Sequence, residues 1–486
     1  MKHTLADQKL LSCLYQGTFG IEVEEHRVCK NQKSLSQLPH PETLGERHGH
    51  PFFQTDFAES QEELVSLPYP STRTCLSHLH SLQAMLQASL DPNDVIWPLS
   101  MPPKLNQDDL TYIPEGFKQR PWYQKYLEKM VEKYGPYYGL MAGIHVNYAP
   151  TKALLDWYQA THDYPDQVSS NNHMLFQIVQ QVLGYRWLLT YLFGASPITE
   201  NQADTIPAAQ RAMAPVRSYR SSKYGFNNLA NFKTDYSNLE NFIDQLEHFI
   251  ETGKLVAPSD FHGPVRLKGV PTFEALTEIG AQYLEFRIFD LNPFTQDGLN
   301  QTTMSFLHLL IMDAIVNPQV WNRDTIDNAE KLNDFVALQH PTEPAPAEAQ
   351  AEARNLFTRL AEIVKAAPAD LRIDFSKALN FAITALDNPD QTVSAQLATF
   401  IKDDSLVDFG MKRGEMIKND FQLEPDFSKF KNVPDTLLKA YQKSHQLGLK
   451  SAISENQISV TFKNQTKTFN NDHEFETYLT SLTERK

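Results

Sequence analysis

The chain has 486 residues and a formal net charge of −15 at pH 7, with no long basic run. This charge argues against a nucleic-acid partner, because nucleic-acid-binding proteins present clustered Lys and Arg. Three scattered cysteines and an N-terminus without an apolar signal core predict a cytoplasmic protein with no disulfide framework.

Three stretches far apart in the chain alternate apolar with charged or polar residues, as half-buried strands do. They cover residues 20–28, 143–148 and 283–290. A period of two places one polar pair on a face of each stretch: Glu22 with Glu24, His145 with Asn147, and Glu285 with Arg287. Each stretch alone is typical of an ordinary amphipathic strand. Together their residue types favour the walls of one metal site, since oxygen ligands with an occasional imidazole suit magnesium or manganese.

A fourth acidic stretch covers residues 55–65. Asp56, Glu59 and Glu63 recur there at spacings that would stack on one side of a helix. Repulsion among so many carboxylates would raise their pKa values and cost stability. Two or three divalent cations with a bound phosphate would supply the counter-charge.

The segments between these stretches show mainly helical patterns. They predict, in chain order, a helix over 71–90, an extended segment at 97–103, a helix over 121–133 and helical structure over 152–193. The apolar runs near 182–193 and 306–316 are interrupted by polar residues, which indicates buried helices and no membrane span. The loop at 214–226 is dense in cations and suited to holding an anion.

Glycine-rich phosphate loops, dinucleotide turns, zinc helices and nucleophile elbows are all missing from the sequence. A nucleotide would therefore have to be held by metals and side chains. Six motifs in order carry a resemblance: Gly20-Ile-Glu-Val-Glu24, Thr55-Asp-Phe-Ala-Glu59, Trp97-Pro-Leu-Ser-Met-Pro102, Gly143-Ile-His-Val-Asn147, Pro264-Val-Arg-Leu-Lys268 and Glu285-Phe-Arg-Ile-Phe-Asp-Leu-Asn-Pro-Phe294. Over roughly residues 15–300 the chain resembles bacterial glutamate-cysteine ligase, also called γ-glutamylcysteine synthetase.

The resemblance implies an α+β, glutamine-synthetase-like fold: a curved, mainly antiparallel sheet forms a funnel with helices outside and magnesium, or manganese in its place, at the centre. It implies that ATP, as co-substrate, drives ligation of the L-glutamate γ-carboxylate to the L-cysteine amine through γ-glutamyl phosphate, the first step of glutathione synthesis. The implied metal shell is Glu22, Glu24, Asp56, Glu59, Glu63, His145 and Glu285. Arg287 would act at the phosphoryl group and Arg220 at a substrate carboxylate, and the implied substrate contacts also include Tyr126, Asn147 and His262.

The chain departs from the family pattern at the acceptor pocket, where Phe226 and His262 stand in place of tyrosines. Residues 221–226 look closer to the ligase half of bifunctional glutathione synthases. Those proteins continue into an ATP-grasp domain, which we do not expect here. Two alternatives stay open: a related carboxylate-amine ligase with a different amine acceptor, and a non-catalytic relative that binds nucleotide.

The domain organisation follows from one proline-rich stretch. We expect a catalytic ligase region over 1–338, a connector at 339–347 and a helical C-terminal region over 348–486. That last region shows no chemical motif. We expect it to pack on the catalytic part and to end with a hairpin near 457–469.

Overall fold

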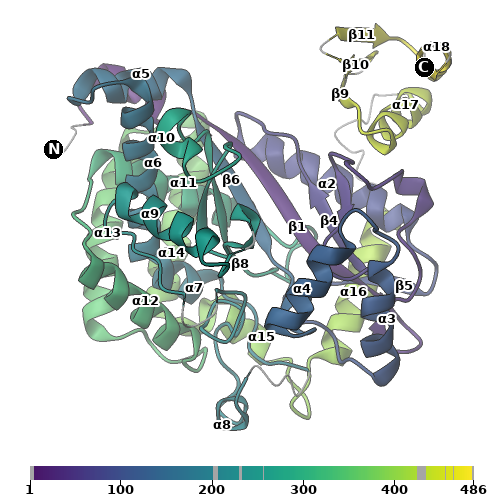
Figure 1. Cartoon of the computed structure of the whole chain (residues 1–486), viewed down its shortest axis with the longest axis horizontal. Coiled ribbons are helices and arrows are strands. Elements are labelled where there is room, and N and C mark those ends of the chain that lie inside the picture. Colours follow the sequence, from purple (N-terminus) through teal and green to yellow (C-terminus); the bar gives the residue numbers. More distant parts are fainter. Residues whose placement is uncertain are drawn as a thin grey trace.

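The computed structural model describes residues 5–200, 206–228, 232–255, 257–423, 434–454, 456–463 and 465–483. An antiparallel sheet crosses its centre, and helices lie on either side of it (Figure 1). The strands of this sheet are β1 (Gly17–Cys29), β2 (Ser34–Leu35), β3 (Phe53–Thr55), β4 (Gln61–Val65), β5 (Asp94–Trp97), β6 (Ile144–Pro150), β7 (Val265–Lys268) and β8 (Tyr283–Phe289). Six of them follow the order β3-β4-β1-β6-β8-β7, and β2 and β5 also pair with β1. The expected α+β class with a mainly antiparallel sheet is confirmed.

Strand β1 joins the two halves of the sheet. It pairs with β6 over residues 17–23 and with β4 over residues 22–26. Ile21 and Val23 are fully buried in the main hydrophobic core. Glu22 and Glu24 alternate with them and so lie on the opposite face of the strand.

The helices surround the sheet in two groups, which Figure 1 shows on its left and right. The helix expected over 71–90 is α2, and the helix expected over 121–133 is α4. The helical structure expected over 152–193 is divided among α5, α6 and α7. The helices are α1 (Gln8–Leu14), α2 (Thr72–Ser89), α3 (Gln107–Phe117), α4 (Gln124–Tyr134), α5 (Lys152–Thr161), α6 (Gln167–Gly184), α7 (Arg186–Phe193), α8 (Ala208–Arg211), α9 (Leu239–Glu251), α10 (Ala275–Glu278), α11 (Gln301–Val316), α12 (Arg323–Ala337), α13 (Ala347–Ala366), α14 (Ala369–Asp387), α15 (Val393–Ala398), α16 (Val407–Leu423), α17 (Asp435–Gln446) and α18 (Asp472–Thr483), with short 3-10 turns η1 (Glu42–Leu44), η2 (Tyr138–Leu140), η3 (Pro258–Asp260) and η4 (Pro389–Gln391).

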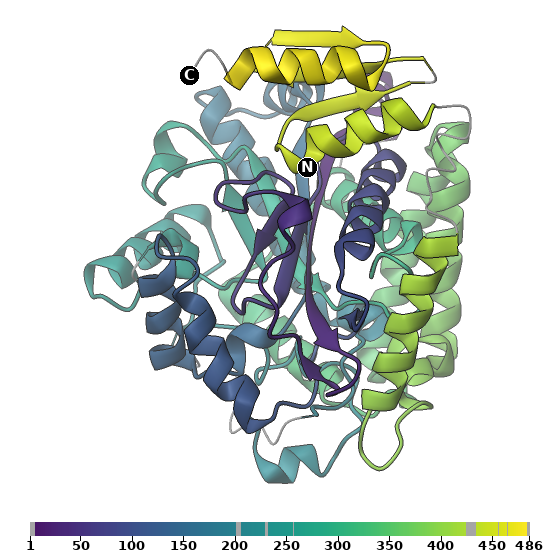
Figure 2. The same cartoon turned by 90° about the vertical axis from the view of Figure 1, so that its right-hand side faces the viewer.

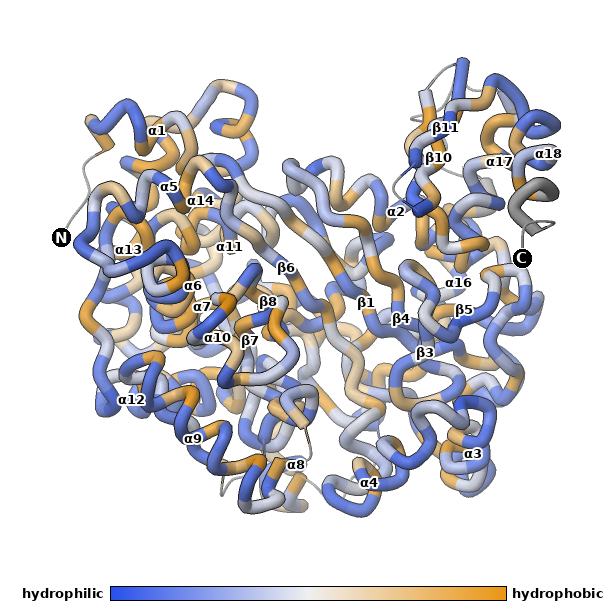
Figure 3. Tube along the Cα trace, turned by 45° about the horizontal axis from the view of Figure 1, so that its top comes forward, coloured by the Kyte–Doolittle hydropathy of each residue, from blue (hydrophilic) through white to orange (hydrophobic). Residues whose placement is uncertain are grey.

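Helix α11 forms the centre of the larger helical group. All its residues from 303 to 316 are buried, and α6, α13 and α14 pack around it. Hydrophobic residues accordingly concentrate along these helices in Figure 3. Among the described residues, none of the helices combines the length and the hydropathy that crossing a membrane requires.

The proline-rich connector lies between two helices of one packed unit. Helix α12 ends at Ala337 and α13 begins at Ala347, and both α13 and α14 then pack on α11. Leu356 and Phe375, which follow the connector, share a core cluster with Ile21 of β1. The connector therefore does not separate two independent cores.

The last elements form a small module at one end of the molecule, drawn in yellow in Figure 2. It contains α17, α18 and an antiparallel sheet in the order β11-β10-β9. Strands β10 and β11 occupy the stretch where the sequence predicts a hairpin, whereas Asn464 of the predicted turn lies outside the described residues. The strands of the module are β9 (Lys450–Ile453), β10 (Ile458–Phe462) and β11 (Gln465–Phe469).

A pair of buried histidines joins this module to α2. His78 Nε2 and His445 Nε2 are 3.0 Å apart. His78 Nδ1 accepts a hydrogen bond from the backbone N–H of Leu67, and His445 Nδ1 donates one to the carbonyl of Tyr441. This pattern assigns the bridging proton to His78 Nε2 and leaves both rings neutral. Burial accordingly lowers the pKa of His445 to about 4.

Candidate functional site

The three strands predicted to bear the site are neighbours in the sheet. Glu22 of β1 lies opposite His145 of β6, and Asn147 of β6 lies opposite Glu285 of β8. The alternation that the sequence shows on each strand is thus brought into register across three strands. One face of the sheet collects acidic, amide and imidazole groups, while the other packs against the core.

The first cluster consists of Glu22, His145 and Glu285. One potential ligand atom from each lies within 4.8 Å of the others. His145 Nδ1 is 3.1 Å from Glu22 Oε2 and 4.0 Å from Glu285 Oε1. Burial, reinforced by the nearby Arg287, holds the pKa of His145 well below its ordinary value. The imidazole is therefore neutral and keeps a lone pair for a ligand.

Unpartnered oxygens accompany this cluster. Asn147 Nδ2 donates to Glu22 Oε1 at 2.8 Å. Buried Asn147 Oδ1 and Glu285 Oε2, in contrast, find no hydrogen-bond partner among the described residues. Burial raises the pKa of Glu285, but Arg287 and Arg266 outweigh that effect and hold the pKa below its ordinary value. Glu285 is therefore an ionised oxygen donor.

The second cluster consists of Glu24, Asp56 and Glu63. Glu24 of β1 lies directly opposite Glu63 of β4. Burial raises the pKa of all three carboxyls, and mutual repulsion adds to it: Asp56 raises the pKa of both Glu24 and Glu63. The pKa of Glu24 reaches about 8. Three neighbouring acids that oppose each other's ionisation are the arrangement that a bound cation would relieve.

The acidic spacing over 55–65 fits one side of a helix, but this segment is not helical. Residues 53–55 and 61–65 form β3 and β4, with Asp56 in the turn between them. Pairing with β1 decides this segment, because a tertiary contact overrides the moderate helical propensity of glutamate. Asp56 and Glu63 reach the second cluster by this route.

Glu59, which was predicted to share their metal shell, has other contacts. Its Oε1 accepts from Arg47 at 2.6 Å and from the backbone N–H of His40 at 3.2 Å. Its side chain also packs against Gly116 of α3. The β3–β4 turn thus directs Glu59 towards Arg47 and α3, and the structure does not bring it together with the second cluster.

Arg287 lies between the clusters. Its NH1 is 3.3 Å from Glu285 Oε1 and 3.3 Å from His145 Nδ1. Burial alone would lower the pKa of Arg287, but the surrounding carboxylates, Glu285 first, raise it. Its Nε makes no hydrogen bond within the described part of the chain. The guanidinium is therefore charged, held in place and still able to donate.

A bulge in β8 aims this arginine. Ile144 and Val146 of β6 pair with Phe289 and Phe286 of β8, so β8 contains one extra residue opposite His145. Bulges of this kind redirect a side chain beside a functional site. Strict alternation, the basis of the sequence prediction, does not describe β8 beyond Phe286.

Arg220, predicted to hold a substrate carboxylate, is engaged with the protein itself. NH1 donates to the carbonyl of Phe289 at 3.0 Å and lies 3.6 Å from Asp290 Oδ1. NH2 donates to the carbonyl of Arg287 at 3.4 Å. A Cβ atom at Gly143 would collide with the guanidinium in this position, so glycine leaves the room that Arg220 uses. Arg220 thus supports the strand that carries Arg287, and its role towards a substrate stays a prediction.

Two basic residues of β7 extend the site beyond the predicted arginines. Arg266 NH1 is 3.6 Å from Glu285 Oε2, and Lys268 Nζ is 3.8 Å from Glu285 Oε1. The signal in the sequence is the alternation of residues 265–268, which places both cations on one face. They add positive charge at the edge of the first cluster.

An aromatic wall borders Arg287. Its guanidinium lies 5.6 Å from the ring centre of Phe226, and this ring in turn lies 4.8 Å from His262. His262 Nδ1 is hydrogen-bonded to the Tyr138 hydroxyl at 2.9 Å. Tyr126, also predicted as a substrate contact, is half-buried, and the charges that act on it include Asp56 and Arg287. Phe226, His262 and Tyr126 thus border the charged centre.

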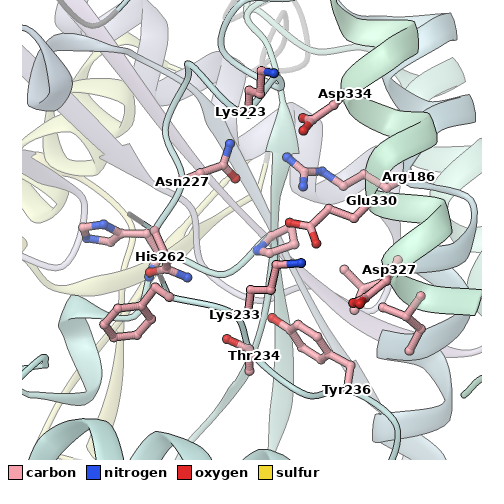
Figure 4. A pocket seen from close by; sticks show the side chains of 15 residues that line it. Arg186, Lys223, Asn227, Lys233, Thr234, Tyr236, His262, Asp327, Glu330 and Asp334 are labelled. Carbon is pink, nitrogen blue, oxygen red and sulfur yellow. The ribbon is translucent and has the colours of Figure 1, made fainter. Parts of the chain in front are cut away.

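A cavity of about 160 Å³ lies behind this wall (Figure 4). Its lining has mixed charge, because acidic residues of α12 face cations from α7 and from the segment after Arg220. It shares Arg186 and His262 with a smaller cavity that reaches Arg220 and Arg287. The charged lining residues are Arg186, Lys223, Lys233, Asp327, Glu330 and Asp334. Four separate segments build this cavity, and the sequence patterns did not reveal it.

The chain shows clear likeness to known proteins. The glutamate-cysteine ligase family model matches residues 3–255 and 254–334. The chain is 36% identical over 406 residues to the glutathione biosynthesis bifunctional protein GshAB of Streptococcus thermophilus, covering 83% of this chain and 52% of that protein. It is 30% identical over 406 residues to the protein of the same description from Pasteurella multocida, with the same two coverages. The chain therefore spans about half the length of the curated relatives it matches.

Solved structures give the same picture of the fold. A bifunctional glutathione synthetase from Pasteurella multocida matches with a TM-score of 0.86 and 27% identity, covering 96% of this chain and 61% of that one. A glutamate-cysteine ligase from Francisella tularensis in complex with AMP matches with a TM-score of 0.73 and 20% identity, covering 89% of this chain and 93% of that one. The second likeness supports the fold alone.

Proposed function

Because the chain belongs to the glutamate-cysteine ligase family, we propose that it catalyses ATP-dependent ligation of the L-glutamate γ-carboxylate to the L-cysteine amine. A carboxylate is a poor acyl donor, so ATP first phosphorylates it to γ-glutamyl phosphate. The cysteine nitrogen then attacks the γ-carbon, and phosphate leaves. The observation that carries this proposal is that two acidic clusters meet at β1, which contributes Glu22 to one and Glu24 to the other, with the charged Arg287 beside them.

The residues present fit divalent cations, magnesium or manganese. The first cluster offers a neutral imidazole and an ionised carboxylate with an oxygen that makes no hydrogen bond within the described residues. The second offers three neighbouring acids whose pKa values are raised by desolvation and by repulsion among carboxylates. Glu22, His145 and Glu285 would hold one ion, and Glu24, Asp56 and Glu63 another. Such ions neutralise phosphate charge when bound.

The protein's own side chains contribute positioning and charge. Arg287 can donate from Nε towards a phosphoryl oxygen, since this nitrogen is buried and unpartnered among the described residues. Arg220 fixes the backbone of Arg287 and so preserves that aim. Arg266 and Lys268 add two cations at the same edge, which favours binding of a polyphosphate.

The aromatic wall is the proposed acceptor side. Burial keeps the pKa of His262 well below its ordinary value, so this ring is neutral and cannot repel an incoming ammonium group. Phe226 and His262 replace the tyrosines expected there, so acceptor choice is the feature of this chain most open to change. The mixed-charge cavity behind the wall would suit a zwitterionic amino acid on its way to the centre.

The test is an ADP-release assay with defined substrates. ATP, magnesium and glutamate without an amine should give slow ADP formation, and cysteine should accelerate it and yield a thiol-bearing dipeptide. ADP release that is insensitive to cysteine would refute the proposal. A panel of other amines separates the alternatives: acceleration by another amine alone indicates a related carboxylate-amine ligase, and no turnover with any amine indicates a nucleotide-binding relative.

We further propose that residues 1–338 carry the ligase activity and that residues 348–486 stabilise it. The extent of the family match, which ends at residue 334, and the packing of α13 and α14 on α11 support this division. We place the reaction in the cytoplasm, which suits the three free cysteines.

A further inference from the structure

Arg120 lies in the loop between α3 and α4, and its side chain reaches the β3–β4 turn that carries Asp56. NH1 donates to the carbonyl of Thr55 at 2.8 Å and also to the carbonyl of Asp56. NH2 donates to the carbonyl of Phe57 at 2.6 Å. Three consecutive carbonyls therefore converge on one guanidinium. Arg120 is only 2% exposed, so bulk water does not compete for these bonds.

These bonds fix the backbone on both sides of Asp56. The carbonyl of Thr55 belongs to the peptide group before Asp56, and its own carbonyl belongs to the peptide group after it. The backbone N–H of Asp56 is held as well, because it donates to the carbonyl of Gln61 at 3.0 Å. With both peptide planes fixed, the direction of the Cα–Cβ bond is fixed too, and only the side-chain torsions of Asp56 stay free.

Apolar packing holds another part of the same turn. The Phe57 ring lies 5.4 Å from the ring of Phe117 in α3, measured between ring centres. It also packs against Gly139, where a Cβ atom would collide with it. The turn is thus anchored to α3 and η2 through Phe57, so Arg120 is needed for the peptide groups beside Asp56 more than for the turn as a whole.

Burying this guanidinium is unfavourable for the fold. Among the described residues no carboxylate forms an ion pair with it: Glu59 is the acid whose charge acts on Arg120 most, but Glu59 pairs with Arg47. Hydrogen bonds to carbonyls offset only part of the cost of burying a charge. A turn that needed only its shape could be closed by neutral donors. The charged, rigid donor is explained if Asp56 has to hold one orientation.

We propose that Arg120 is a positioning residue for the second cluster, because it fixes the direction in which Asp56 projects towards Glu24 and Glu63. It acts through the backbone of the turn and not by contact with a ligand. The loop that carries Arg120 leads directly into α4, which bears Tyr126, so Arg120 also connects the proposed acceptor side to the second cluster. The inference rests on the metal role proposed for that cluster.

The test is manganese binding to the full chain, measured by electron paramagnetic resonance without nucleotide. The wild type should bind one ion at each cluster. In Arg120→Lys a compact ammonium on a flexible stem replaces the planar fork, so the three carbonyls lose their fixed geometry. This variant should weaken one of the two sites about 10- to 100-fold and leave the other unchanged. Arg47→Lys, a matched change beside Glu59 that contacts none of the three carbonyls, should bind both ions like the wild type.

A double-mutant cycle separates positioning from a general structural role. On an Asp56→Asn background, Arg120→Lys should cause little further loss of manganese affinity, because it acts through Asp56. Additive losses would overturn the proposal.

Manganese binding also separates this inference from the proposed function. Two ions bound with wild-type affinity by Arg120→Lys, even with a lower Tm, would overturn the role of Arg120 alone. A wild type that binds no manganese would overturn the metal sites themselves and this inference with them. If circular dichroism shows that Arg120→Lys does not fold, Arg120→Gln takes its place, since it removes the buried charge and keeps a planar donor; the same loss is expected, and wild-type binding would again overturn the proposal.

Discussion

Replacing Glu24 by glutamine should stabilise the protein when divalent ions are removed. Burial, and after it repulsion from Asp56, raises the pKa of Glu24 from its ordinary 4.5 to about 8. Between these two values the folded state holds a proton that the unfolded state has released, so wild-type stability falls as the pH rises. The amide of Glu24→Gln does not titrate, so the stability of the variant would not fall with pH in this way. Its oxygen could still accept the hydrogen bond that the backbone N–H of Gly143 donates to Glu24 Oε2 in the wild type.

The size of this stabilisation follows from the difference between pH 7 and the pKa of 4.5 that Glu24 has in the unfolded state. A gap of about 2.5 units at roughly 1.4 kcal/mol per unit gives about 3 kcal/mol in favour of Glu24→Gln at pH 7. The gain should shrink towards zero near pH 4.5. A chain of this length has an unfolding entropy of about 1 kcal/mol per degree, so Tm at pH 7 should rise by about 3 °C.

The assay is a series of unfolding curves with a chelator from pH 4.5 to pH 8.5. The wild type and Glu24→Gln should diverge as the pH rises, while Glu115→Gln, a matched change at an exposed site of α3, should follow the wild type. Excess magnesium should reverse the order, because the variant loses one ligand charge. Parallel pH profiles for the wild type and Glu24→Gln, or equal stabilisation of both by magnesium, would refute the reasoning.

Four further outcomes test other parts of the site and fold. Glu285→Gln should lower kcat about 100-fold or more at saturating magnesium with unchanged circular dichroism, and wild-type turnover would exclude Glu285 as a ligand. Arg287→Lys should cost a similar factor in kcat, because a point charge does not replace a planar fork; an unchanged kcat would make Arg287 structural. Arg220→Ala should raise KM for one amino acid more than for ATP if Arg220 holds a carboxylate, at a cost of about 2 to 5 kcal/mol, whereas a lower kcat alone would assign it to positioning. Unfolded His445 binds a proton below about pH 6.5, whereas the folded residue does so only near pH 4, so stability falls as the pH falls through this window. Below pH 5 the backbone amides of α17, which contacts His78 through His445, should therefore lose protection from hydrogen exchange before those of α11; simultaneous loss would contradict this.

The residue patterns were sufficient to predict the strands that bear the site. Alternation at 20–28, 143–148 and 283–290 arises from burial of one face, which is local information. That these three stretches are neighbours followed from their residue types, since Glu22, His145 and Glu285 make chemical sense only together. The helices around α2, α4 and α6 were likewise readable from apolar spacing.

Other features depend on contacts that the patterns do not contain. The segment with Asp56 and Glu63 is a hairpin because β4 pairs with β1, and the sequence spacing fits a helix equally well. The bulge in β8 appears only when β6 is laid against it. Glu59 and Arg220 have suitable chemistry for the predicted roles. In the structure, however, Glu59 pairs with Arg47, and Arg220 donates hydrogen bonds to backbone carbonyls of β8.

The pairing of β1 on both sides limits how the chain can vary in length. Side chains alternate with a period of two, so one residue inserted before Glu22 would exchange the faces of the strand. Where the strand keeps its register before the insertion, Glu22 and Glu24 would enter the core and Val23 would face the site. Deleting one residue would do the same. We therefore expect related sequences to differ along β1 by substitution, with gaps confined to the loops beyond its ends.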